Sequence, residues 1–83
     1  MKEHIERAVG RGVTAARRVG GGCINEGWRV ELEGGRTAFV KTRAQVAPDE
    51  YESEAAALRW LAEPDAVNVP RVLGVSEHVL VLE

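Results

Sequence analysis

A lysine, a glutamate and a run of glycines are the residues of this sequence whose types and spacing could do chemistry. Lys41 ends the stretch AFVK, Glu54 follows thirteen residues later in YESEAAAL, and Gly20-Gly21-Gly22 precede both. An ammonium group held by a carboxylate can contact a ligand anion, whereas such a pair, when buried, adds little to stability. Glycines let the backbone come close to a phosphate and offer N–H groups to it. Together the three features predict a site for a ligand that carries phosphate.

The elements that must position these residues follow from the periodicity of the apolar side chains. Residues 28–33 alternate apolar and polar, which is typical of a half-buried strand, and Gly34-Gly35 predicts a tight turn into a partner strand. Helices are expected over residues 2–9 and from Pro48-Asp49 to Pro64, and strands over residues 13–19, 28–33, 37–42, 71–75 and 79–82. The predicted fold class is α+β, a five-stranded antiparallel sheet with one packed helix, in a single domain over residues 1–83.

The side-chain directions within these elements bring the lysine and the glutamate together. Because successive side chains of a strand point to opposite faces, Phe39 and Lys41 are predicted to share one face of the sheet. Glu54 lies on the same stripe of its helix as Leu58 and Leu61, which are expected to face the sheet. A lysine on the inward face of a sheet needs a partner for its charge. We therefore predict a buried Lys41–Glu54 ion pair.

Each of these features also has an ordinary structural explanation. A triple glycine is often only a flexible loop, a strand lysine often lies at a solvated edge, and a helix glutamate often decorates the surface. In this order, however, a glycine-rich loop, a strand lysine and a helix glutamate match the phosphate clamp of protein kinases. We interpret the combination, rather than any single residue, as a nucleotide-binding site.

Composition and charge argue against several other classes of function. The net charge is −2 with acidic and basic residues interspersed, which disfavours a nucleic-acid partner. The single cysteine, Cys23, excludes an internal disulfide and a cysteine-rich metal site, and His4 and His78 lack the spacing of metal ligands. No apolar run reaches the roughly 18 residues of a membrane span, and the first residues do not resemble a signal peptide. We expect a cytoplasmic chain with no membrane partner and no metal site of its own.

The end of the sequence bears on its completeness. Eighty-three residues build only a modest core. The last strand, residues 79–82, runs apolar almost to the final position without a turn or a polar tail. A strand that stops in this way predicts a chain cut short, or one half of an assembly.

Four stretches of the sequence are specific enough to suggest a family. GGCIN before an aromatic-Arg-Val strand, FVK, the helix pattern E-x-E-A-x-x-L and VPRVLGV together resemble the amino-terminal lobe of the fructosamine kinase (ketosamine kinase) family. That family is a branch of the protein-kinase-like superfamily, beside the aminoglycoside phosphotransferases, and the resemblance covers about residues 13–83. The resemblance implies that the chain is a protein-kinase-like amino-terminal lobe. The parent protein of this lobe would use ATP and Mg²⁺ to phosphorylate a sugar hydroxyl of a ketosamine, which is a sugar attached to an amine.

The resemblance also implies roles for individual residues. The ATP-binding residues would be Gly21, Gly22, Cys23, Ile24 and Asn25 over the phosphates, Val30 and Phe39 against the adenine, Lys41 at the α- and β-phosphates, Glu54 holding Lys41, Leu82 as gatekeeper and Glu83 at the start of the hinge. Trp28 stands where protein kinases have a third glycine, a position at which fructosamine kinases tolerate an aromatic residue. No HGD- or DFG-like run is present, so we expect no general base or magnesium ligand in this chain. The 83 residues alone are therefore expected to be inactive, with Mg²⁺ held by a carboxy-terminal lobe.

Cys23 and two alternative functions remain open. Cys23 stands beside glycines near a surface expected to attract phosphate, which would favour the thiolate. The resemblance implies a redox-sensitive cysteine that can cross-link two chains, although a lone cysteine is often an inert small hydrophobe. One alternative function is an aminoglycoside phosphotransferase-like kinase lobe. The other is a non-catalytic lobe that forms a homodimer or binds a partner through Cys23 or the exposed wall of the adenine pocket.

Overall fold

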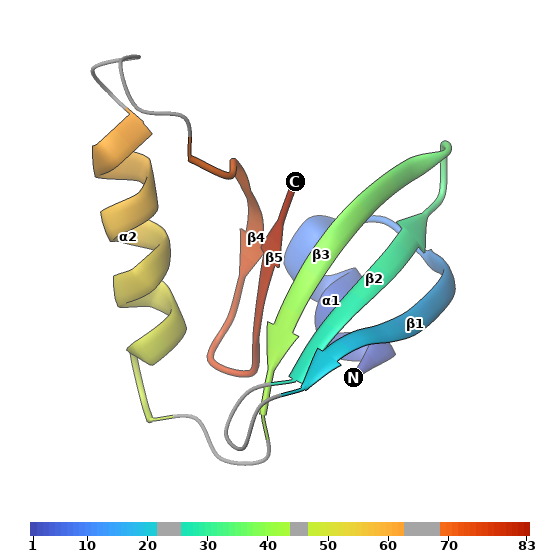
Figure 1. Cartoon of the computed structure of the whole chain (residues 1–83), viewed down its shortest axis with the longest axis horizontal. Helices are drawn as coiled ribbons and strands as arrows, with labels where there is room; N and C mark the ends of the chain where they lie inside the picture. The colour runs from blue at the N-terminus through green and yellow to red at the C-terminus, as the bar shows by residue number, and fades with distance from the viewer. Residues whose placement is uncertain (22–25, 44–46, 63–68) are drawn as a thin grey trace.

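The computed structural model describes residues 1–21, 26–43, 47–62 and 69–83. These residues form two helices and five strands: α1 (Lys2–Val9), β1 (Val13–Gly21), β2 (Glu26–Leu32), β3 (Arg36–Thr42), α2 (Glu50–Ala62), β4 (Val72–Val75) and β5 (Val79–Leu82). The strands make one antiparallel sheet in the order β1-β2-β3-β5-β4 (Figure 1). The predicted α+β class and the five-stranded antiparallel sheet are confirmed.

β1 and β2 extend further toward each other along the chain than the sequence predicted. Gly20 pairs with Gly27, and Gly21 pairs with Glu26, so the ladder continues past the ends expected for both strands. β1 therefore runs to Gly21 and β2 begins at Glu26. Glycine is disfavoured in strands, which is why the sequence pattern placed these positions in a loop. The pairing of the two strands outweighs this low strand propensity.

One face of the sheet is covered by α1 and carries the larger part of the core. The buried side chains of this core are Ile5, Val30, Leu32, Ala38, Val40, Val79 and Val81. Ile5 is the residue that α1 buries among them, and Ala8 and Val9 pack around it. Two helices thus pack against the sheet, where the sequence predicted one. Ile5, Ala8 and Val9 lie at i, i+3 and i+4, so α1 does carry a short apolar stripe, and this stripe packs against the sheet.

The opposite face is covered by α2, over the end of the sheet formed by β4 and β5 (Figure 1). Tyr51 and Ala55 are fully buried there against Leu80 and Leu82 of β5. Burial raises the pKa of the Tyr51 hydroxyl above its ordinary value. The predicted helix–sheet contact is therefore confirmed at the first two turns of α2.

The last turn of α2 extends beyond the sheet. Leu61 is 38% exposed and Trp60 is 69% exposed, so the prediction that Leu61 faces the sheet is wrong. The 13 residues of α2 span roughly 20 Å, whereas the four residues of β4 and of β5 span only about 13 Å. Leu58 is the last residue of the apolar stripe that packs against the core on this face.

A pair of histidine rings joins α1 to the turn between β4 and β5. The ring centroids of His4 and His78 lie 4.0 Å apart, and the Glu77 carboxylate lies 3.3 Å from His78 Nε2. Partial burial and then the positive charges of His78, the amino terminus and Arg7 lower the pKa of His4, while Glu3 acts in the opposite direction. The folded chain therefore resists protonation of His4.

We expect the chain to lose stability as the pH falls below about 6.5, the ordinary pKa of histidine. Because the pKa of His4 is lowered in the folded chain, the unfolded chain binds the proton more readily, and acid favours unfolding. The variant His4→Gln lacks this titration. Urea midpoints at about pH 7.5 and pH 5.5 should therefore differ less in the variant than in the original chain. An equal pH dependence in the two proteins would contradict this assignment.

Candidate functional site

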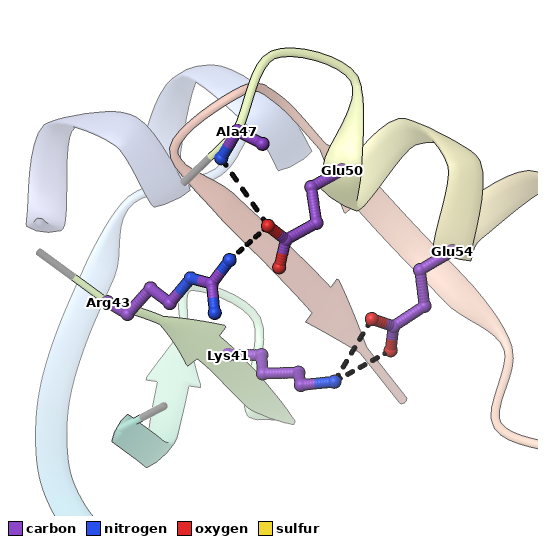
Figure 2. Close-up of polar contacts among 5 residues, drawn as sticks. All are labelled: Lys41, Arg43, Ala47, Glu50 and Glu54. Carbon is purple, nitrogen blue, oxygen red and sulfur yellow. Dashed lines mark hydrogen bonds and ion pairs between the residues drawn. The ribbon is translucent and has the colours of Figure 1, made fainter. Parts of the chain in front are cut away.

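An ion pair between β3 and α2 forms the centre of the candidate site. The ammonium group of Lys41 donates to both carboxylate oxygens of Glu54, at 3.0 and 2.9 Å (Figure 2). The two side chains are 29% and 36% exposed. The predicted pairing is confirmed, but the pair is half-buried rather than buried, because it lies at the margin of the packed contact made by Tyr51 and Ala55. One side of the ammonium group thus remains open to solvent or to a ligand.

The face of the sheet that carries Lys41 can be followed across the strands. Lys41 lies opposite Gly27 of β2 and Leu80 of β5, while Phe39 lies opposite Arg29 and Leu82. Directly opposed residues of antiparallel strands point to the same face. Phe39, Lys41 and Leu82 therefore share one face, as their predicted roles require. We call this surface the Lys41 face.

The aromatic ring of Phe39 lies against the backbone of Gly27. A Cβ atom at Gly27 would lie 2.9 Å from Phe39 Cζ, which is closer than real side chains approach. Gly27 is consequently buried, while Phe39 remains 40% exposed. An exposed ring beside an ammonium group offers an apolar surface next to a cation. The sequence singled out Gly20-Gly21-Gly22 and gave no special role to Gly27.

The prediction for Val30 is wrong. Val30 is fully buried in the core beneath α1, and its partner across the ladder is Ala38, which is buried on the same side. It therefore points away from Phe39 and Lys41 and cannot touch a ligand on the Lys41 face. The prediction was wrong by one position along β2, and neighbouring residues of a strand point to opposite faces of the sheet. Arg29 occupies the position on the Lys41 face that the prediction gave to Val30.

Arg29 and a second arginine make the β1–β2 end of the Lys41 face positive. Arg17 of β1 lies directly opposite Arg29, and both side chains are exposed. A shallow hollow beside them is lined by Ala15, Ala16, Arg17, Arg29 and Glu31. Like charges in directly opposed positions destabilise a sheet. Two arginines and one glutamate leave this hollow with an excess of one positive charge. Alternation counted from Lys41 through the Gly34-Gly35 turn could have found Arg29.

The remaining predicted site residues fall into two groups. Gly21 ends β1, Leu82 is almost buried beside Tyr51 and Ala55, and the backbone N–H of Glu83 donates to the carbonyl of Arg71 at 2.8 Å. Their contacts with a nucleotide stay a prediction. Gly22, Cys23, Ile24 and Asn25, including the candidate redox cysteine, lie outside the described residues.

Neither a metal centre nor a membrane span is found in the part of the chain that the structure describes. Over residues 1–21, 26–43, 47–62 and 69–83, no three histidine, cysteine, aspartate or glutamate side chains gather closely enough to hold a metal ion. Within the same ranges, neither helix combines the length and the apolar character needed to cross a membrane.

Comparison with known proteins places this geometry in a family. The model of the fructosamine kinase family matches residues 1–82 of the chain. The chain belongs to the fructosamine kinase family. The resemblance that the four sequence stretches indicated is thereby confirmed.

Relatives of this fructosamine kinase family member include two chloroplastic proteins named protein-ribulosamine 3-kinase. The one from Oryza sativa subsp. indica is 33% identical over 58 residues, and the one from Oryza sativa subsp. japonica is 31% identical over 58 residues. Each match covers 70% of this chain and 17% of the relative. The names of these relatives indicate a kinase.

A solved structure shares the fold. It is that of a candidate fructosamine-3-kinase from Thermobifida fusca, which is 29% identical and superposes with a TM-score of 0.89. The match covers 100% of this chain and 30% of that protein. This chain thus spans less than a third of the length of the relatives that it matches.

Proposed function

We propose that this member of the fructosamine kinase family is the nucleotide-binding lobe of a kinase that transfers phosphate from ATP to a sugar hydroxyl of a ketosamine. The observation that carries the proposal is the Lys41–Glu54 pair, in which both carboxylate oxygens accept from one ammonium group. The names of the two rice relatives support the acceptor class, because a ribulosamine is a ketosamine.

The chemistry proposed for the chain is charge neutralisation and orientation. Phosphoryl transfer needs the phosphate oxygens held in place and their negative charge balanced, with little covalent chemistry by the protein. Lys41 would donate to these oxygens, and Glu54 would hold the ammonium group at a fixed position while leaving it part of its hydrogen-bonding capacity. The exposed ring of Phe39 and the side chain of Leu82 would contact the base.

The other requirements of the reaction would be met by residues outside this chain. The donor set for a metal ion is not present among the described residues, so we assign neither the magnesium ion that accompanies ATP nor the general base to them. Arg17 and Arg29 would add to the positive potential that draws a polyphosphate toward the Lys41 face.

Methyl NMR of the chain during an ATP titration tests the proposal. Leu82 and Val81 are neighbours on β5 that point to opposite faces, one beside Phe39 and one into the core beneath α1. We expect ATP to shift the methyl signals of Leu82 and the amine signal of Lys41 while the methyl signals of Val81 move little. Equal shifts at Leu82 and Val81, or shifts confined to the α1 face, would refute binding at this site.

A further inference from the structure

A second ion pair lies beside the Lys41–Glu54 pair. The guanidinium group of Arg43, one residue beyond the end of β3, donates to a carboxylate oxygen of Glu50 in the first turn of α2 (Figure 2). These side chains are 22% and 32% exposed, which makes the pair more buried than Lys41 and Glu54. The same oxygen of Glu50 also accepts the backbone N–H of Ala47 at 3.4 Å.

The two ion pairs form a ladder whose spacings match. Lys41 and Arg43 are two residues apart in an extended segment, which places them roughly 6.6 Å apart along the chain. Glu54 and Glu50 are four residues apart on one face of α2, which places them about 6 Å apart along the helix axis. The order is reversed on the helix, so the strand end and α2 run in opposite directions. Each cation therefore meets the carboxylate at the matching position of α2.

The packing of α2 explains why the Lys41–Glu54 ion pair alone would not hold Glu54 in position. α2 packs on β4 and β5, and within the described residues only Tyr51 and Ala55 are fully buried on it. The last turn of α2 lies beyond the sheet, as the exposure of Trp60 and Leu61 shows. A helix with so little buried surface can tilt about a single contact, and a tilt would move Glu54 away from Lys41.

The environment of Arg43 shows that its charge depends on Glu50. Arg43 Nε is buried and has no hydrogen-bond partner among the described residues. Removing one partner of a partly buried pair leaves a charge that the surroundings do not compensate. Within the described part of the chain, Glu50 is the carboxylate that compensates Arg43.

We propose that Arg43 and Glu50 are positioning residues: their ion pair sets the orientation of α2 and thereby holds Glu54 against Lys41. The role in ATP binding rests on the proposed function, whereas the mechanical coupling between the two ion pairs does not. Neither Arg43 nor Glu50 needs to touch the nucleotide.

The coupling can be measured without any ligand. The chain contains two lysines, Lys2 and Lys41, so its lysine amine NMR spectrum has two signals. The signal of Lys41 reports its pair with Glu54, and that of exposed Lys2 serves as an internal reference. We expect Arg43→Gln and Glu50→Gln each to accelerate exchange of the Lys41 amine protons by about 3- to 10-fold and to leave Lys2 unchanged.

A neighbouring carboxylate provides the matched control. Glu52 lies in the same first turn of α2 as Glu50 and is exposed. Glu52→Gln therefore removes the same interaction with the helix dipole without touching Arg43. We expect it to leave the Lys41 signal unchanged. If Glu50→Gln and Arg43→Gln both behave like Glu52→Gln, the proposal is overturned.

A double variant, Arg43→Glu with Glu50→Arg, exchanges the two charges. It tests the proposal even if one of the single variants does not fold. It restores an ion pair of reversed direction, and we expect exchange of the Lys41 amine to return to within about 2- to 3-fold of the original chain. A folded double variant with an unrestored Lys41 signal would also overturn the proposal.

An ATP titration of the same variants separates the proposal from the proposed function. We expect Arg43→Gln to weaken ATP binding by about 3- to 10-fold, with rescue by the exchanged pair. One outcome is that neither the original chain nor any variant binds ATP, while the Lys41 signal still responds to Arg43→Gln. The proposed function then fails, and the coupling between the two ion pairs stands. If ATP binds equally to all variants and the Lys41 signal is unchanged, the coupling fails and the proposed function stands.

Discussion

Under the proposed function, Lys41→Met in a kinase that contains this lobe is expected to lower the rate of phosphoryl transfer from ATP by about a hundred- to a thousand-fold. Loss of one preorganised donor to a developing charge typically costs that much. The fold should survive, because an ion pair whose side chains are 29% and 36% exposed contributes about 1 kcal/mol or less to stability. The measurement is the initial rate with a ketosamine acceptor, together with the urea midpoint of each protein.

Lys2→Met is the matched control for this experiment. It makes the same substitution at the other lysine of the chain, on the exposed start of α1. We expect its rate to equal that of the original protein. Glu54→Gln should fall between the two, because the ammonium group stays but loses its fixed position. An undiminished rate with Lys41→Met would show that Lys41 takes no part in the reaction, and it would refute the proposed phosphate clamp.

The sequence was sufficient to predict the features that depend on local pattern. Alternation placed Phe39 and Lys41 on one face, and the apolar stripe of α2 placed Glu54 toward them, and both are confirmed by the ladder and the ion pair. Each depends only on the side-chain period of its own element and on one packing decision. The family motifs were equally local, and residues 1–82 match the family.

The features that the sequence did not reveal depend on the lengths and offsets of separate elements. Leu61 continues the stripe of α2, yet it is exposed because β4 and β5 are shorter than the helix. Val30 was assigned to the wrong face because its role came from the family resemblance, whereas its direction depends on how β2 pairs with β3. Arg43 and Glu50 were missed because their contact depends on how the chain returns from β3 to α2.

Gly74→Ala is expected to destabilise the chain by about 3 kcal/mol, because Gly74 is the point at which α1 approaches β4 most closely among the described glycines. A Cβ atom at Gly74 would lie 2.5 Å from the carbonyl oxygen of Ala8, 2.8 Å from its carbonyl carbon and 2.9 Å from Val9 Cγ1. The first two atoms belong to the helix backbone, so no side-chain rotation relieves the overlap. α1 would have to move away from the sheet as a unit.

A loss of this size is large for such a chain, whose total stability we expect to be roughly 4–12 kcal/mol from the usual range per residue. Displacement of α1 would also uncover Ile5, the fully buried anchor of that helix, and would separate the rings of His4 and His78. Urea unfolding measures the free energy, and the ring proton signals of His4 report the separation directly.

Gly20→Ala gives the comparison that isolates the close approach. Gly20 also lies in a strand, but a Cβ atom there meets no atom within 4 Å, and its φ is not in the left-handed region. Alanine at Gly20 should be neutral or slightly stabilising, since it restricts the unfolded chain. Equal stabilities for the two variants would mean that α1 is not seated on β4. A large loss confined to Gly74→Ala, together with changed His4 signals, would show that the glycine of the VLGV strand is required by the helix behind the sheet.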